Sequence, residues 1–345
     1  MEPKPQTQIS NPKTSPHFVC PVCGSGFIGL WQLVAHVMTH RVDLIVRHNP
    51  PGVELLPSSP PSENRSGVSS PEPEKVIYED WSGSLEILKL AYEMKMFVLI
   101  IGPKGTGKTT LVRKFAEVVG KPLYTINFSL RTKESHLIGT TMLENSTTRF
   151  ALGVIPRSMQ EGAILYLDEL NAAEPDVLLR LDEALDDRRE LNIKEAGELI
   201  HIKAHPDWFV VATVNPLSHA GTKELPPQLL SRFPVRIYLD YPPEEIELKI
   251  VKLHVGELSR KEEALVKRAI KLANKLRELA KVEEIYYSPS LRETIAFAKL
   301  IKAGVDPVKS ARIVFVNAYW QWGAISQQKV EELMTSFFGV KNEGE

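Results

Sequence analysis

The stretch Gly102-Pro103-Lys104-Gly105-Thr106-Gly107-Lys108-Thr109 fits the pattern G-x-x-x-x-G-K-S/T and decides the fold of this chain. It follows an apolar, strand-like run at 97–101 and precedes a helix-like segment at 110–119, which is the context of a phosphate-binding loop. Glycines let backbone N–H groups turn toward a phosphate, Lys108 reaches the β/γ oxygens, and the Thr109 hydroxyl is placed to bind Mg²⁺. The sequence therefore predicts a nucleotide site from Gly102 to Thr110.

Length and composition limit the remaining choices. With 345 residues, 43% apolar and 25% charged, the chain has room for about two globular units plus small additions. A net charge of -1 gives no overall electrostatic footprint for nucleic acid or an anionic membrane. The sequence has no long apolar run, and the start Met1-Glu2-Pro3-Lys4-Pro5 lacks an apolar signal region, so we expect a cytoplasmic protein without a membrane partner.

A second motif has the ligand types and spacing of a tetrahedral zinc site, with C-x2-C-x12-H-x3-H formed by Cys20, Cys23, His36 and His40. These are the only two cysteines of the chain, which argues against a disulfide framework. A segment this short needs the metal to fold stably. Residues 17–41 therefore resemble a single ββα zinc finger that binds Zn²⁺, with a small core of Phe18, Phe27 and Leu33.

The composition of this finger bears on what it contacts. No Lys or Arg lies between Phe18 and His40, and of the base-reading helix positions only Gln32 can hydrogen-bond to a base edge. The helix also carries more apolar side chains than so small a core can cover. We therefore expect the finger to dock onto protein, with nucleic-acid contact as the weaker alternative.

The chain changes character at several points. We expect residues 1–16 to be disordered and residues 42–75, rich in Pro, Ser and Glu, to form a linker. Residues 76–241 alternate strands and helices, which is typical of a parallel sheet, and residues 242–345 read as helical. The expected fold is α/β, with a five-stranded parallel sheet of order 5-1-4-3-2, whose strands are 97–101, 123–127, 163–167, 209–214 and 235–239.

Acidic and amide side chains follow two of these strands. Asp168 and Glu169 end the apolar run 163–167, where an acid can join a Mg²⁺ shell and a second acid can polarise a water that attacks the γ-phosphate. In the expected strand order Asn215 lies beside Glu169 and can hold the same water. Arg232 precedes the fifth strand and Arg292 opens a later helix, at positions that a ring ATPase needs.

From about Val76 to Val340 the chain resembles AAA+ ATPases of the MoxR type, including the CbbQ and NorQ branch. The order of motifs carries this resemblance: Leu137-Ile138-Gly139, then Phe150 to Arg157, then Glu161 to Asn171. The family usually has Asp before the arginine of its arginine finger, where this chain has Ser231. The resemblance implies a Walker A pair, a Walker B pair, sensor 1, an arginine finger and sensor 2, which correspond in turn to Lys108 and Thr109, Asp168 and Glu169, Asn215, Arg232 and Arg292.

The same resemblance implies a homo-oligomeric ring, expected to be hexameric, that uses ATP and Mg²⁺ to remodel or mature a client protein, with a von Willebrand factor A domain protein as a partner. It also implies a helical lid after residue 241 and hairpin insertions at 140–153 and 190–203, where Phe150, Arg149 and Lys194 are candidates for contacting a substrate; a packing role for Phe150 is equally open. A DNA-associated AAA+ motor is the alternative function. In a third interpretation the finger tethers the ring and nucleotide acts as an assembly switch.

Overall fold

The computed structural model describes residues 18–19, 26–27, 76–144, 147–194, 199–216 and 223–339. The chain divides into two units, Met1–Pro71 and Glu72–Glu345. In the first unit, β1 (Phe18–Val19) and β2 (Gly26–Phe27) pair antiparallel, at the positions of the hairpin in the expected finger. The four expected zinc ligands, the expected disordered start and the expected linker lie outside the described residues.

A parallel five-stranded sheet forms the centre of the second unit. Its strands are β3 (Val98–Ile101), β4 (Leu123–Asn127), β7 (Ile164–Asp168), β10 (Phe209–Val214) and β11 (Val235–Tyr238). They lie in the order β11-β3-β10-β7-β4, which reads 5-1-4-3-2 when the strands of this sheet are numbered along the chain. Four strand ends, in β3, β7 and β11, differ from expectation by one residue. Every residue of β10 is buried, as in a sheet covered on both faces.

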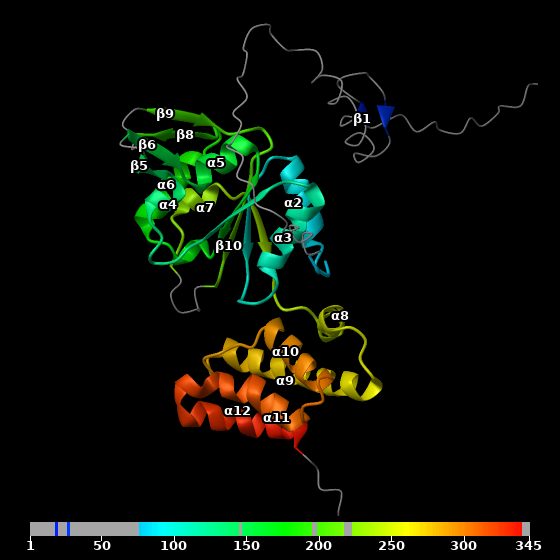
Figure 1. The fold of residues 1–345 in the computed structure, drawn as a ribbon. Coiled ribbons are helices and arrows are strands. Elements are labelled where there is room, and N and C mark those ends of the chain that lie inside the picture. The colour runs from blue at the N-terminus through cyan, green and yellow to red at the C-terminus, as the bar shows by residue number, and fades with distance from the viewer. Residues whose placement is uncertain are drawn as a thin grey trace, which may run out of the picture. The chain divides into compact units, whose positions relative to one another are not determined.

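Helices cover both faces of this sheet (Figure 1). On one side lie α2 (Ser84–Glu93) and α3 (Lys108–Val119), and on the other lie α5 (Val154–Glu161), α6 (Pro175–Ala184) and α7 (Pro227–Ser231). The short α4 (Glu134–Leu137) precedes the first hairpin. Helix α3 ends at Gly120, whose φ of 64° is the left-handed conformation that commonly closes helices. These elements share one apolar core.

Two hairpins leave the central sheet. In the first, β5 (Gly139–Glu144) pairs with β6 (Thr147–Leu152), and in the second, β8 (Glu190–Ile193) pairs with β9 (Ile200–Lys203). Both were expected at 140–153 and 190–203 from the family resemblance, and the structure shows them as antiparallel pairs. Met142 and Leu143 of β5 are exposed, whereas Leu191 and Ile193 of β8 are buried in the core.

Residues after β11 are helical and have an apolar core of their own. The helices are α8 (Glu244–Val255), α9 (Arg260–Lys281), α10 (Leu291–Lys302), α11 (Pro307–Ala311) and α12 (Gly323–Phe338), with a π-helical turn at Arg312–Val316 and 3-10 turns at Asn317–Trp322 and, earlier, Leu170–Ala172. Ser259 caps α9 by accepting a hydrogen bond from the Glu262 N–H at 3.3 Å. Within the described residues, no helix combines the length and the apolar character needed to cross a membrane.

Candidate nucleotide site

The phosphate-binding sequence borders a cavity of about 530 Å³ in the second unit. The loop after β3 forms its floor, and the ends of β7 and β10 contribute Asp168, Glu169 and Asn215. Residues 77–81 and side chains of α8 and α10 close the remaining sides. The cavity therefore lies at the carboxyl ends of parallel strands, where open α/β sheets bind their ligands.

The loop geometry follows from its glycines. Gly107 has a φ of 97° and lies directly before α3, so the chain turns into the helix with its first N–H groups free to face a ligand. A Cβ on Gly102 would lie 2.0 Å from the Leu239 carbonyl oxygen, so only glycine fits between β3 and the end of β11. Thr106 is buried and its hydroxyl donates to the Pro103 carbonyl at 3.1 Å, which closes the loop on itself.

Lys108 is almost fully buried and its ammonium group is held by the site. Nζ donates to the carbonyl oxygens of Gly102 at 2.6 Å and Pro103 at 2.7 Å, and to Oδ1 of Asn215 at 3.1 Å. Burial lowers the pKa of Lys108 to about 8, although the charges of Asp168 and Glu169 act in the opposite direction. A phosphate bound at the loop would compete for these hydrogens and would favour the charged amine.

A chain of hydroxyl groups links the two candidate Mg²⁺ ligands. The Thr109 hydroxyl lies 3.1 Å from the Tyr166 hydroxyl, which donates to Oδ1 of Asp168 at 2.7 Å. The Thr213 hydroxyl donates to the same oxygen at 2.6 Å. Mg²⁺ binds through one or two carboxylates, waters and substrate phosphates, so one hydroxyl and one carboxylate beside a phosphate loop fit this ion. The described residues contain no cluster of His, Cys, Asp and Glu that would form a protein-only metal site.

Glu169 is held in an unusual backbone conformation beside Asn215. Its φ of 54° lies in the left-handed region, which is uncommon for a residue other than glycine and tends to occur at functional sites. The Glu169 N–H donates to the Thr213 hydroxyl at 3.1 Å, and Asn215 Nδ2 donates to Glu169 Oε1 at 3.3 Å. Asn171 fixes Asn215 in turn, donating to its carbonyl oxygen at 2.8 Å and accepting from its N–H at 3.3 Å. The carboxylate thus faces the cavity in a defined orientation.

The two candidate arginines differ in position. Arg292 lines the cavity from the first turn of α10, as Lys104 does from the loop. Arg232 does not line it: Nε donates to Asp182 Oδ1 at 2.9 Å, and Nη2 lies 3.7 Å from Asp186 Oδ2. The hydrogen bond with Asp182 raises the pKa of Arg232 further, so this arginine stays charged. The structure therefore gathers the loop residues, Asp168, Glu169, Asn215 and Arg292 in one place and puts Arg232 elsewhere.

Three polar residues of the site were missed in the sequence: Tyr166, Asn171 and Thr213. Tyr166 precedes Asp168 by two positions and Thr213 precedes Asn215 by two, on strands β7 and β10. Because side chains two apart in a strand share a face, a polar residue at that spacing inside an apolar run was the available signal. Asn171 carried no comparable signal, since its partner Asn215 is 44 residues away in sequence.

Comparison with known proteins identifies relatives for both parts of this unit. Residues 97–233 match the family "AAA domain (dynein-related subfamily)", and residues 247–325 match "CbbQ/NirQ/NorQ C-terminal". The denitrification regulatory protein NirQ of Stutzerimonas stutzeri is 32% identical over 68% of this chain and 82% of its own length. NirQ of Pseudomonas aeruginosa is 33% identical over 70% of this chain and 90% of its own length. NorQ of Paracoccus denitrificans is 35% identical over 61% of this chain and 74% of its own length. The resemblance expected from the order of motifs is confirmed.

Proposed function

This chain belongs to the CbbQ/NirQ/NorQ branch of the MoxR-type AAA+ ATPases, and we propose that it uses ATP hydrolysis to remodel or mature a client protein. It is an ATPase by this membership. The observation that carries the proposal is the convergence of Lys108, Asp168, Glu169 and Asn215 on one cavity, because phosphate binding, metal binding and water activation need these groups together.

Each residue then has a proposed role. Gly102 to Thr110 hold the phosphates of ATP, and Thr109 and Asp168 hold Mg²⁺, which when bound neutralises charge on the β- and γ-phosphates. Glu169 accepts a proton from the attacking water, and Asn215, through its hydrogen bond to Glu169, orients that carboxylate and the water. Arg292 reaches the phosphates from α10. These are the residues that a single subunit would contribute to its own nucleotide site.

We further propose a homo-oligomeric ring, with six subunits as the expected number, in which Arg232 serves the site of a neighbour. The position of Arg232 supports this arrangement, since it is ion-paired to α6 and does not line its own cavity. Asp182 and Asp186 hold the guanidinium group by Nε and Nη2 and so restrict its rotamers before a neighbour binds. An arginine preset in this way loses little conformational entropy when it meets a phosphate.

Glu169→Gln tests the hydrolytic site. The amide keeps the shape of the side chain and its position beside Asn215 but cannot accept a proton, so turnover should fall at least about 100-fold. ATP binding should remain, because the phosphate loop is untouched. Radiolabelled ATP retention and phosphate release measure the two quantities separately. Glu174→Gln, an acid of the same type that pairs with Lys223 outside the cavity, is the matched control and should hydrolyse ATP normally.

The client side of the proposal concerns the hairpins. Phe150, Arg149 and Lys194 lie on or beside them, and Met142 and Leu143 of β5 are exposed apolar residues, which suit contact with a protein. A von Willebrand factor A domain protein is the proposed partner. The Glu169→Gln variant loaded with ATP should hold a client that the active protein releases. Stimulation of hydrolysis by duplex DNA that weakens with salt would instead identify a nucleic-acid motor.

The expected zinc finger extends this proposal to recruitment. We propose that Cys20, Cys23, His36 and His40 bind one Zn²⁺ and that the finger docks onto protein. Cys23→Ser should abolish zinc binding while ATP binding survives, because the proline-rich segment 42–75 separates the two parts in sequence. Elemental analysis and nucleotide titration of the full chain measure both effects. Zinc missing from freshly purified wild-type protein would refute the assignment.

A further inference from the structure

Four consecutive carbonyl groups of the phosphate loop accept hydrogen bonds, some from side chains of the loop itself and some from the helical region. The carbonyls of Gly102 and Pro103 accept from Lys108 Nζ, and that of Pro103 also accepts from the Thr106 hydroxyl. The carbonyl of Lys104 accepts from the Tyr241 hydroxyl at 3.0 Å, and that of Gly105 from the Leu291 N–H at 3.4 Å. Lys108 is the residue that must turn toward a phosphate, whereas Tyr241 and Leu291 belong to the helical region and its connection. The carbonyl groups of one short loop thus bind both the Lys108 amine and donors from the helical region.

Tyr241 lies where the chain passes from β11 into α8. Tyr241 is partly buried, and its hydroxyl donates to the Lys104 carbonyl in the loop and lies 3.4 Å from the Ser288 hydroxyl. The guanidinium carbon of Arg277 sits 4.1 Å from the centre of the ring, a cation–π distance. Burial raises the pKa of Tyr241, so its hydroxyl stays protonated and can donate to a carbonyl.

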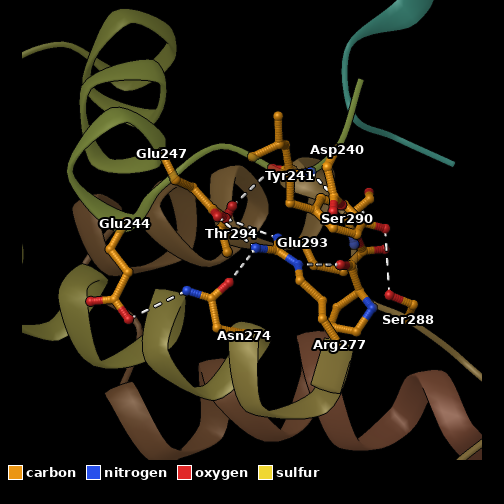
Figure 2. Close-up of polar contacts among 12 residues, drawn as sticks. Asp240, Tyr241, Glu244, Glu247, Asn274, Arg277, Ser288, Ser290, Glu293 and Thr294 are labelled. Carbon is orange, nitrogen blue, oxygen red and sulfur yellow. Dashed lines mark hydrogen bonds and ion pairs between the residues drawn. The ribbon is translucent and has the colours of Figure 1, made fainter. Parts of the chain in front are cut away.

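Arg277 holds the segments around Tyr241 together. From near the C-terminal end of α9 its guanidinium group donates to both carboxylate oxygens of Glu247 on α8, at 2.6 and 3.0 Å, and to the Pro289 carbonyl at 2.8 Å. A further bond of 2.7 Å goes to Asn274 on its own helix. The side chains of Arg277 and Glu247 are 4% and 0% exposed. Figure 2 shows these contacts converging on Arg277 between two helices and the loop before α10.

The start of α10 is pressed against the phosphate loop. A Cβ added to Gly105 would lie 2.2 Å from the Ser290 Cβ, so the two backbones meet at contact distance. Ser290 caps α10 by accepting from the Arg292 N–H at 3.1 Å and donating to Glu293 at 2.7 Å. Since Arg292 follows Ser290 by two residues, a shift of the loop carbonyls would also shift this residue, which lines the cavity.

We propose that Tyr241 is a positioning residue that couples phosphate-loop occupancy to the placement of Arg292. When Lys108 turns to a phosphate, the Gly102 carbonyl loses its donor and the Pro103 carbonyl keeps only the Thr106 hydroxyl, so the loop backbone readjusts. The Tyr241 hydroxyl, bonded to the next carbonyl, transmits this change to the helical region, and Arg277 keeps the Tyr241 ring in place. This inference rests on the proposed binding of ATP at the loop.

Tyr241→Phe in the full chain tests the coupling, because it removes one hydroxyl and keeps the ring under Arg277. We expect kcat for ATP to fall about 2- to 10-fold, the effect of one hydrogen bond, with KM changed less than about twofold. Hydrogen exchange with a non-hydrolysable ATP analogue gives the decisive readout. In wild type, nucleotide should slow exchange in residues 102–110 and also in 288–295. In Tyr241→Phe the first segment should stay protected and the second should lose most of its protection.

Ser288→Ala is the matched control, since it removes the other neighbour of the Tyr241 hydroxyl and leaves the bond to Lys104; it should behave as wild type. Wild-type protection of 288–295 in Tyr241→Phe, or an equal loss in Ser288→Ala, would overturn the role of the Tyr241–Lys104 bond. Absence of protection in 102–110 of the wild type would instead refute nucleotide binding at the loop, so the two failures are distinguishable.

Discussion

Arg232→Ala should reduce ATP turnover by about 10³- to 10⁵-fold, because a transition-state charge on the γ-phosphate of the neighbouring subunit loses its cation. Nucleotide binding should persist, since Arg232 does not line its own cavity. Steady-state phosphate release and equilibrium binding of labelled ATP measure the two effects. Arg236→Ala is the matched control: Arg236 is exposed on β11 and donates to the Leu230 carbonyl at 3.0 Å, so its loss should leave turnover near wild type.

Mixing two inactive variants distinguishes action on a neighbour from action within one chain. A Lys108→Ala subunit cannot hold phosphate but still offers Arg232, and an Arg232→Ala subunit still offers an intact pocket. If the arginine acts across an interface, mixed rings contain complete sites and recover part of the wild-type activity. A mixture that stays inactive, under conditions in which labelled subunits exchange, would exclude Arg232 as the residue that completes the neighbour's site.

The sheet and the phosphate loop could be predicted because their signals are local. Gly102 to Thr109 encode a turn, an N-terminal helix dipole and a charged amine within eight residues. The strands are short apolar runs, and the acids at the end of β7 follow such a run directly. Their meeting with Asn215 then depends on strand order, and the sheet has the order in which the strand before Asn215 lies beside β7.

The remaining contacts could not be predicted because each joins residues that are distant in sequence. In α9, Arg277 follows the apolar residues Leu272, Ala273 and Leu276 and reads as a charged residue at the edge of an amphipathic helix. Its burial depends on Glu247, which lies 30 residues earlier, and on the Pro289 carbonyl. The ion pair of Arg232 with Asp182 of α6 is similar, since the two residues are 50 apart in sequence. No pattern within one element indicates such pairs.

Arg277→Met should lower the free energy of unfolding by about 3–5 kcal/mol, since it leaves the Glu247 carboxylate buried without its partner. Urea denaturation followed by circular dichroism measures this loss. A surface pair gives the matched control: Lys267 and Glu263 lie in the same helix, 2.7 Å apart, and the lysine is 56% exposed, so Lys267→Met should cost less than about 1 kcal/mol.

The double variant Arg277→Met with Glu247→Leu shows whether the cost comes from the unpaired charge. Replacing both partners of a buried ion pair with apolar residues of similar volume is often neutral, so the double variant should regain most of the stability that Arg277→Met loses. Its activity should not recover with its stability, because the Tyr241 ring and the Pro289 carbonyl still lack the guanidinium group that held them. A double variant as unstable as the single one would show that packing around Arg277, and not the charge of Glu247, sets the cost. Full recovery of ATP turnover together with stability would show that Arg277 contributes nothing to the position of the phosphate loop.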